Sequence, residues 1–173
     1  MRLRWLLLAL LLLPAWALDD QQKALLAGAR SCLGDVYDSG YYTGGPPPKG
    51  RGACPEVVYY AYLKIGVDLQ AEVDRDLRAN PSLYPSRRDR NIDYRWCPNL
   101  IVWFSRHTKT LPRDSDWRAG DVVFFNLLGD GVADHIGIVS DKPGHVIHNL
   151  GPRCVEDRAL ERLRIVGHFR MPR

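Results

Sequence analysis

The sequence predicts an α+β fold in which helices form the first part of the chain and an antiparallel sheet forms the second. Apolar residues recur at three- and four-residue spacing up to His107, which is the period of helices with one buried face. From Trp117 onward, short apolar runs alternate with tight-turn residues, which is typical of strands. Helices followed by strands, rather than alternating with them, favour an α+β layout. A chain of 173 residues suits one domain with one core.

The N-terminal residues 1–17 have the pattern of a secretory signal peptide. A basic start is followed by an apolar run from Trp5 to Leu13 and by an Ala-x-Ala ending at Ala17. The run is too short for a comfortable membrane span, so an uncleaved anchor is the weaker alternative. We expect cleavage after Ala17, export to the periplasm or cell surface, and one mature domain over residues 18–173 without a stable membrane anchor.

The charge and the cysteines narrow the class of protein. Loss of Arg2 and Arg4 leaves 22 basic and 20 acidic residues, a net charge of +2 that gives no argument for a nucleic-acid partner. The four cysteines (Cys32, Cys54, Cys97 and Cys154) contain no CxxC pair and no zinc-finger spacing. We therefore expect no metal and no cofactor. An oxidising compartment permits disulfides. If Cys54 is a working thiol, one bridge among the other three is possible, and the sequence does not select which.

Four helices are predicted in the first part of the chain. The first covers residues 21–32, after two acidic residues and before Gly34. The second begins at Cys54 and ends at Gly66. A third covers residues 71–78 and is stopped by Asn80-Pro81, and a fourth runs from an Asn99 cap to His107. Residues 36–50 form a loop leading to Cys54, and residues 81–99 form either one wall of a cleft or a solvated loop.

The second part of the chain predicts an antiparallel meander. Its expected strands are residues 122–125, 134–140 and 145–149, with a fourth at 163–169. The turn signals Asp130-Gly131 and Pro143-Gly144 separate the first three.

Cys54 is the candidate nucleophile. Pro55 suits the first turn of a helix, and a thiol at a helix N-terminus is stabilised as the thiolate. The competing interpretation is a buried cysteine or half of a disulfide. A thiol nucleophile needs a base and an orienting group, and His135 and His148 lie on neighbouring expected strands. Without Cys54, both would be interpreted as satisfied core histidines. His107, His145 and His168 are expected at a helix end, a turn and an edge strand, respectively.

The chain contains four further motifs, namely Gly52-Ala53-Cys54, Trp117-x-x-Gly120-Asp121-Val122-Val123-Phe124-Phe125, His135-Ile136-Gly137-Ile138-Val139 and Val146-Ile147-His148-Asn149. With these motifs in this order, it resembles the NlpC-type cysteine peptidases. The resemblance implies a circularly permuted papain-like fold and a bacterial enzyme of a superfamily in which many members cut peptidoglycan stem peptides. The chain looks closest to a little-characterised branch of exported single-domain proteins whose domain has no known function.

The resemblance assigns roles to individual residues. Cys54 matches the nucleophile, His135 the general base and His148 the third polar residue. Asn149 is a rival for that third role, because strand alternation lets only one of the two face the cleft. Tyr42 resembles an upstream tyrosine near the nucleophile, so Tyr42 and Asn149 are candidates for substrate binding, with a packed loop aromatic as the alternative for Tyr42. Relatives usually carry Ser, Thr or Asp after the cysteine, whereas here Pro55-Glu56 removes one N–H close to the thiol.

The resemblance implies an exported cysteine hydrolase of the bacterial envelope. It would cleave an amide bond in peptidoglycan stem peptides through Cys54, His135 and His148 and an acyl-enzyme, acting as a monomer. One alternative is amidase or acyltransferase action on another envelope substrate. Another is a catalytically silent module that binds the cell wall.

Overall fold

A computed structural model of the protein describes residues 18–85 and 89–172, and the expected signal peptide at residues 1–17 lies outside them. The helices are α1 (Asp20–Arg30), α2 (Cys54–Leu63), α3 (Leu69–Ala79), α4 (Cys97–His107) and α5 (Ala159–Arg162), with two 3-10 helices, η1 (Pro81–Leu83) and η2 (Asp93–Arg95). The strands are β1 (Val36–Tyr37), β2 (Arg51–Gly52), β3 (Lys109–Thr110), β4 (Val122–Phe125), β5 (His135–Val139), β6 (Val146–His148), β7 (Val155–Asp157) and β8 (Ile165–Arg170).

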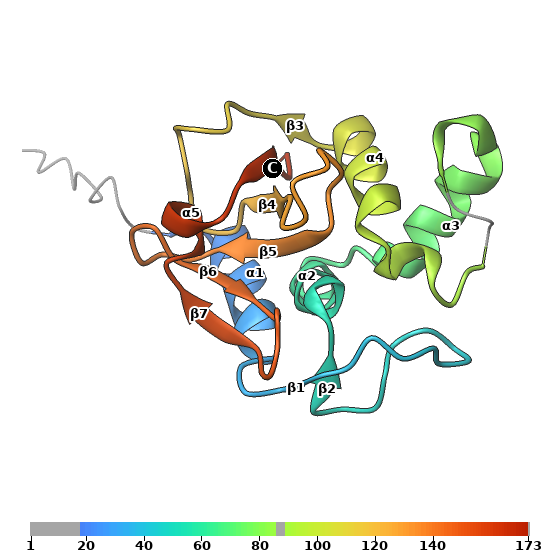
Figure 1. Ribbon diagram of the computed structural model, residues 1–173, viewed down its shortest axis with the longest axis horizontal. Helices are drawn as coiled ribbons and strands as arrows, with labels where there is room; N and C mark the ends of the chain where they lie inside the picture. Colours follow the sequence, from blue (N-terminus) through green and yellow to red (C-terminus); the bar gives the residue numbers. More distant parts are fainter. Residues whose placement is uncertain (1–17, 86–88, 173) are drawn as a thin grey trace, which may run out of the picture.

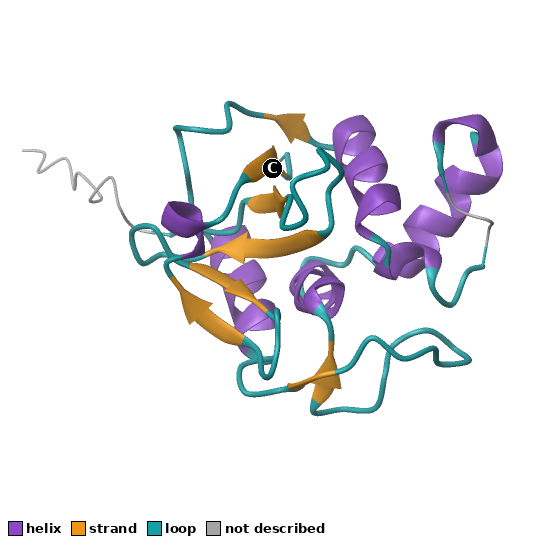
Figure 2. Ribbon diagram, in the orientation of Figure 1, coloured by secondary structure: helices purple, strands orange, loops and turns teal. Residues whose placement is uncertain are grey.

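Six of the strands form one antiparallel sheet in the order β3-β8-β4-β5-β6-β7. The consecutive strands β4, β5 and β6 pair directly with one another and form the expected meander, which the unpredicted strand β7 extends. Strand β8 then returns to lie between β3 and β4, while β1 and β2 form a separate parallel pair. Figure 2 shows this sheet on one side of the molecule and α3 with α4 on the other. The expected α+β fold is confirmed.

Helix α2 lies at the centre, between the sheet and the α3–α4 pair (Figure 1). Its residues Val58, Ala61 and Tyr62 are fully buried, as expected for a helix covered on several sides. Helix α1 approaches it so closely that a Cβ atom at Gly28 would lie 2.3 Å from the carbonyl oxygen of Tyr60. Only glycine permits this spacing, and the close packing fixes α2 against the sheet.

The predicted helices α1, α2 and α3 are confirmed to within two or three residues at each end. The predicted start of α4 was wrong, because the helix begins at Cys97 and not after an Asn99 cap. Pro98 occupies the first turn, where its missing N–H costs nothing. The Asn99 side chain is instead buried and donates to the backbone carbonyl of Asp93 at 3.1 Å.

The C-terminal part contains elements that the sequence pattern did not predict, namely β3, β7 and α5. Because β3 covers the outer side of β8, His168 is on an internal strand and not on the expected edge. Its side chain is fully buried and lies 2.8 Å from the Asp121 carboxylate. Asp121 also accepts the backbone N–H of Arg118 at 2.8 Å, so it braces the turn that precedes β4.

Candidate active site

The structure places Cys54 at the first position of α2, with only Ala53 between it and β2. The turn is fixed by Glu56, whose carboxylate accepts the Ala53 N–H at 2.7 Å. Pro55 has no N–H, so among residues 53–55 only the Cys54 N–H remains as a donor beside the thiol. The Cys54 side chain is nearly buried, with 7% of the residue exposed.

Two histidines from the sheet form a hydrogen-bonded line behind this thiol. His135 is the first residue of β5 and His148 is the last residue of β6. His135 Nε2 lies 2.8 Å from His148 Nδ1, and His148 Nε2 lies 3.1 Å from the Asp157 carboxylate on β7. Both rings are buried, with at most 2% of each residue exposed. Antiparallel pairing of β5, β6 and β7 therefore brings three polar side chains into one row.

This row determines which nitrogen of each imidazole carries a proton. Hydrogen bonds from His148 and Arg162 hold the pKa of Asp157 below its usual value, despite partial burial that raises it. The ionised carboxylate favours a proton on His148 Nε2, so Nδ1 accepts from His135 Nε2–H. Burial lowers the pKa of His148, which keeps its ring neutral. His135 Nδ1 is then the nitrogen free to accept a proton from Cys54.

The Cys54 thiol is held as an acid stronger than an ordinary cysteine. A hydrogen bond from the Cys97 side chain lowers its pKa well below the usual value, against burial that raises it. The hydrogen bond and charge of His135 and the N–H of Ile136 lower the pKa further. A cysteine at a helix N-terminus with a histidine partner is the environment in which thiols become nucleophiles.

Sequence reasoning missed Cys97, Asp157 and Arg95. The one available signal for Cys97 was the repeated Cys-Pro dipeptide, which begins α2 and α4 alike. Asp157 lies on the unpredicted strand β7, so the pattern gave no reason to place it beside His148. Arg95 donates to Glu56 Oε1 at 2.6 Å and to the carbonyls of Asp38 and Gly40, so it joins the loop before β2 to α2.

The other two predicted residues lie outside this row. Among the residues that the structure describes, no hydrogen bond joins Asn149 to His135. It donates to the Gly52 carbonyl at 2.8 Å and to the Asp35 carbonyl at 3.2 Å, and so fastens the segment before Cys54 to the sheet. Tyr42 donates its hydroxyl to Asp38 at 2.8 Å. Within the described residues, no hydrogen bond joins Tyr42 to Cys54 or to either histidine.

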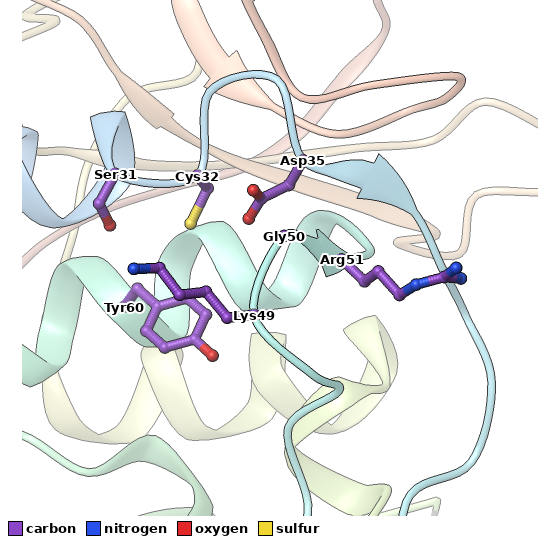
Figure 3. Close-up of a pocket in the computed structure, with 7 residues that line it drawn as sticks. All are labelled: Ser31, Cys32, Asp35, Lys49, Gly50, Arg51 and Tyr60. Carbon is purple, nitrogen blue, oxygen red and sulfur yellow. The ribbon is translucent and has the colours of Figure 1, made fainter.

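A cavity of about 310 Å³ lies beside residues 49–51, which precede Cys54 in the sequence. Figure 3 shows that Cys32 and Asp35 come from the end of α1 and the loop after it, and that Arg51 extends away from the other side chains. Lys49 and Tyr60 also line this cavity. Cys54 is not among the lining residues, so the cavity is separate from the Cys54–His135 pair.

All four cysteines are present as free thiols. In residues 18–85 and 89–172, His, Cys, Asp and Glu side chains do not gather in groups of three with the geometry of a metal site. Over the same residues, no helix has the length and apolar character needed to cross a bilayer.

Comparison with known proteins identifies the family. The profile described as "Domain of unknown function (DUF1287)" matches residues 26–171. The chain belongs to the DUF1287 family. It is also 43% identical over 166 residues to "Uncharacterized protein YijF" of Escherichia coli strain K12, a match that covers 85% of this chain and 80% of that protein.

Solved structures show what fold this DUF1287 protein has. NlpC1 from Trichomonas vaginalis superposes with a TM-score of 0.55 at 17% identity, over 90% of this chain and 45% of that one. The peptidoglycan hydrolase RipB from Mycobacterium tuberculosis gives 0.57 at 16% identity, over 88% and 65%. An N-acetylmuramoyl-L-alanine amidase from Bacteroides uniformis gives 0.51 at 13% identity, over 90% and 100%. The chain thus spans under half the length of the Trichomonas protein, and the expected NlpC-type, papain-like fold is confirmed.

Proposed function

We propose that this DUF1287 protein is an exported cysteine hydrolase of the bacterial envelope that cleaves an amide bond in peptidoglycan stem peptides. The observation that carries the proposal is the row from Cys54 through His135 and His148 to Asp157, joined by contacts of 2.8 and 3.1 Å between the last three. A wall-binding module has no use for an acidified thiol with a histidine base. The named hydrolase and amidase among proteins of the same fold support the choice of substrate class.

In this mechanism Cys54 is the nucleophile and His135 the acid and base. The thiolate attacks the amide carbon, and the oxyanion is stabilised by the Cys54 N–H at the start of α2. His135 donates a proton to the departing amine, which leaves an acyl group on the Cys54 sulfur. A water then gives a proton to His135 and attacks the thioester, which releases the acid and restores the thiol. His148 orients the His135 ring throughout and is the third member of the site.

The remaining parts of the proposal concern the whole protein. Residues 1–17 are the leader that directs export, and residues 18–173 are the hydrolase domain, acting as a monomer in the periplasm or at the cell surface. No metal or cofactor takes part. Asn149 supports the segment before Cys54, and Tyr42 with its loop contacts the substrate. Mass measurement of the exported protein checks cleavage, since a chain starting at Met1 refutes it.

Digestion of purified peptidoglycan tests the activity. We expect the wild-type protein to release stem-peptide fragments, identified by mass spectrometry, and Cys54→Ala and His135→Ala to release none. The matched control is Cys154→Ala, which removes another buried thiol outside the site. Release of fragments cut between sugar and peptide would place the cleaved amide bond outside the stem peptide, and absence of both products and wall binding would favour the alternative of another envelope substrate. Wall binding without any product, in protein with a reduced Cys54, contradicts the hydrolase and leaves the binding module.

A further inference from the structure

The two cysteines that begin α2 and α4 form a pair. Cys54 and Cys97 each occupy the first helical position, and each is followed by a proline in the first turn. Both side chains belong to the same buried core cluster, each thiol is the main influence on the pKa of the other, and 7% and 5% of the residues are exposed. The site described above uses Cys54 alone as the nucleophile, so the adjacent second thiol is left without an assigned chemistry.

A buried ion pair holds these two helix starts together. Glu56 lies two residues after Cys54, and Arg95 lies two residues before Cys97. Arg95 Nε donates to Glu56 Oε1 at 2.6 Å and Arg95 Nη2 to Oε2 at 3.3 Å, and both side chains are at most 3% exposed. The proximity of the thiols is therefore built into the fold and does not depend on surface loops.

The two thiols differ in the way that thiol–disulfide exchange requires. The Cys97 hydrogen bond and His135 lower the pKa of Cys54, which makes it the attacking thiolate. The hydrogen bond to Cys54 and burial raise the pKa of Cys97, which remains a protonated partner. Burial raises the pKa of Cys32 and of Cys154 to about 12, so neither of these thiols attacks readily.

We propose that Cys97 is the partner of Cys54 in a reversible disulfide. In an oxidising compartment this disulfide blocks the nucleophile, and reduction by a dithiol restores it. The consequence for activity rests on the proposed hydrolase function, whereas formation of the disulfide does not.

Formation of the Cys54–Cys97 disulfide requires an oxidant, which is either a small-molecule disulfide or a protein disulfide of the envelope. The Cys54 thiolate attacks one sulfur of that disulfide, a mixed disulfide forms, and the other sulfur leaves as a thiolate that takes a proton. Cys97 gives its proton to His135 and attacks the Cys54 sulfur, which expels the second thiol of the oxidant. Two protein thiols are oxidised to one disulfide, and one oxidant disulfide is reduced to two thiols.

The test uses the purified protein in buffers with increasing ratios of oxidised to reduced glutathione. Samples are quenched in acid, free thiols are alkylated, and peptides are identified by mass spectrometry. We expect a Cys54–Cys97 linked peptide to accumulate, alkylation of both residues to fall together, and both to return on reduction. In Cys97→Ser we expect glutathione to remain on Cys54. The control Cys154→Ser should form the same linked peptide as the wild type.

Glutathione on Cys54 of the wild type while Cys97 remains fully alkylated overturns the proposal, and so does a disulfide formed only between Cys32 and Cys154. Wall digestion by the same samples separates the two hypotheses. A reduced protein that cleaves no peptidoglycan but forms the Cys54–Cys97 link contradicts the hydrolase and leaves the disulfide intact. A protein that cleaves peptidoglycan equally in every redox buffer contradicts the disulfide and leaves the hydrolase.

Discussion

Arg95 and Glu56 form a bidentate ion pair that is almost completely buried, with N–O distances of 2.6 and 3.3 Å. Glu56 accepts the N–H of Ala53, and Arg95 also binds the carbonyls of Asp38 and Gly40. Four segments therefore meet at this pair: the loop after β1, the turn before Cys54, the first turn of α2 and the residues before α4. The position of the Cys54 thiol depends on it.

Removing the cation of this pair should destabilise the protein strongly. Arg95→Met leaves the Glu56 carboxylate buried without its charge partner, which costs about 3–5 kcal/mol. Urea unfolding followed by circular dichroism measures the change. The control Arg75→Met removes an exposed pair with Glu72 at 2.7 Å and should cost about 0–1 kcal/mol. Equal losses in the two variants would contradict the central role of Arg95.

The reactivity of Cys54 should extend to lower pH than that of an ordinary thiol. Because the Cys97 hydrogen bond and His135 lower its pKa, the thiolate persists below the usual thiol range and is lost only as pH falls through the lowered pKa. Iodoacetamide alkylation of reduced protein, followed by peptide mass, measures the profile. His135→Ala should shift it to higher pH. His145→Ala, which changes a histidine at a turn, should not, and a shift of equal size there would remove His135 from its assigned role.

Asp157 should act as a positioning residue, through His148. Asp157→Asn removes the charge that places the proton on His148 Nε2, so the His135 base is less often in the useful tautomer. We expect kcat for peptidoglycan cleavage to fall about 10- to 100-fold with little change in KM.

The control for this prediction is Glu161→Gln on α5, which changes an exposed carboxylate paired with Arg158 at 3.0 Å. It should leave kcat unchanged. A rise in KM with constant kcat in Asp157→Asn would show that Asp157 binds substrate and does not position His148.

Glu156 should make the stability of the protein depend on pH between about 4.5 and 2. Burial raises its pKa, but hydrogen bonds from Lys142, Ser140 and Arg30 lower it to about 2, from a usual value of 4.5. A carboxyl with a depressed pKa in the folded state stabilises that state above pH 4.5, and this contribution is lost as pH falls toward 2.

Comparing wild type with Glu156→Gln by urea unfolding at several pH values tests this. The difference should be about 2–3 kcal/mol at pH 7 and should shrink below pH 4.5. Asp20→Asn, at a fully exposed carboxylate, serves as the control. A difference that remains constant from pH 7 to pH 3 would assign the effect to packing and not to charge.

The helices and the central strands could be predicted from sequence because their signals are local. Val122–Phe125 is an unbroken apolar run and became β4 with the same bounds, and the helix after Cys54 carries its own proline and acidic start. Short elements that form only through pairing with distant parts of the chain could not be predicted in this way. Strand β7 has only three residues, and β3 pairs with a strand more than fifty residues later in the chain.

For the candidate site, the sequence could predict the types of residue involved and the neighbouring strands that carry the two histidines. Strand alternation required that His148 or Asn149 face the cleft, and the choice depended on the register of β6, which the sequence does not specify. In the structure, His148 is hydrogen-bonded to His135, and Asn149 is hydrogen-bonded to the backbone before Cys54. Cys97 and Asp157 come from segments 43 and 103 residues beyond Cys54, and only the folded chain brings them to it.

The insertion of β8 between β3 and β4 has a consequence for how the protein is made. Strand β4 has β5 on one side as soon as residue 139 is available, but its other edge stays open until residues 165–170 are present. An open apolar edge leaves Phe124 and Phe169 without their mutual ring contact. The growing chain therefore cannot complete its sheet until residues 165–170 have been made.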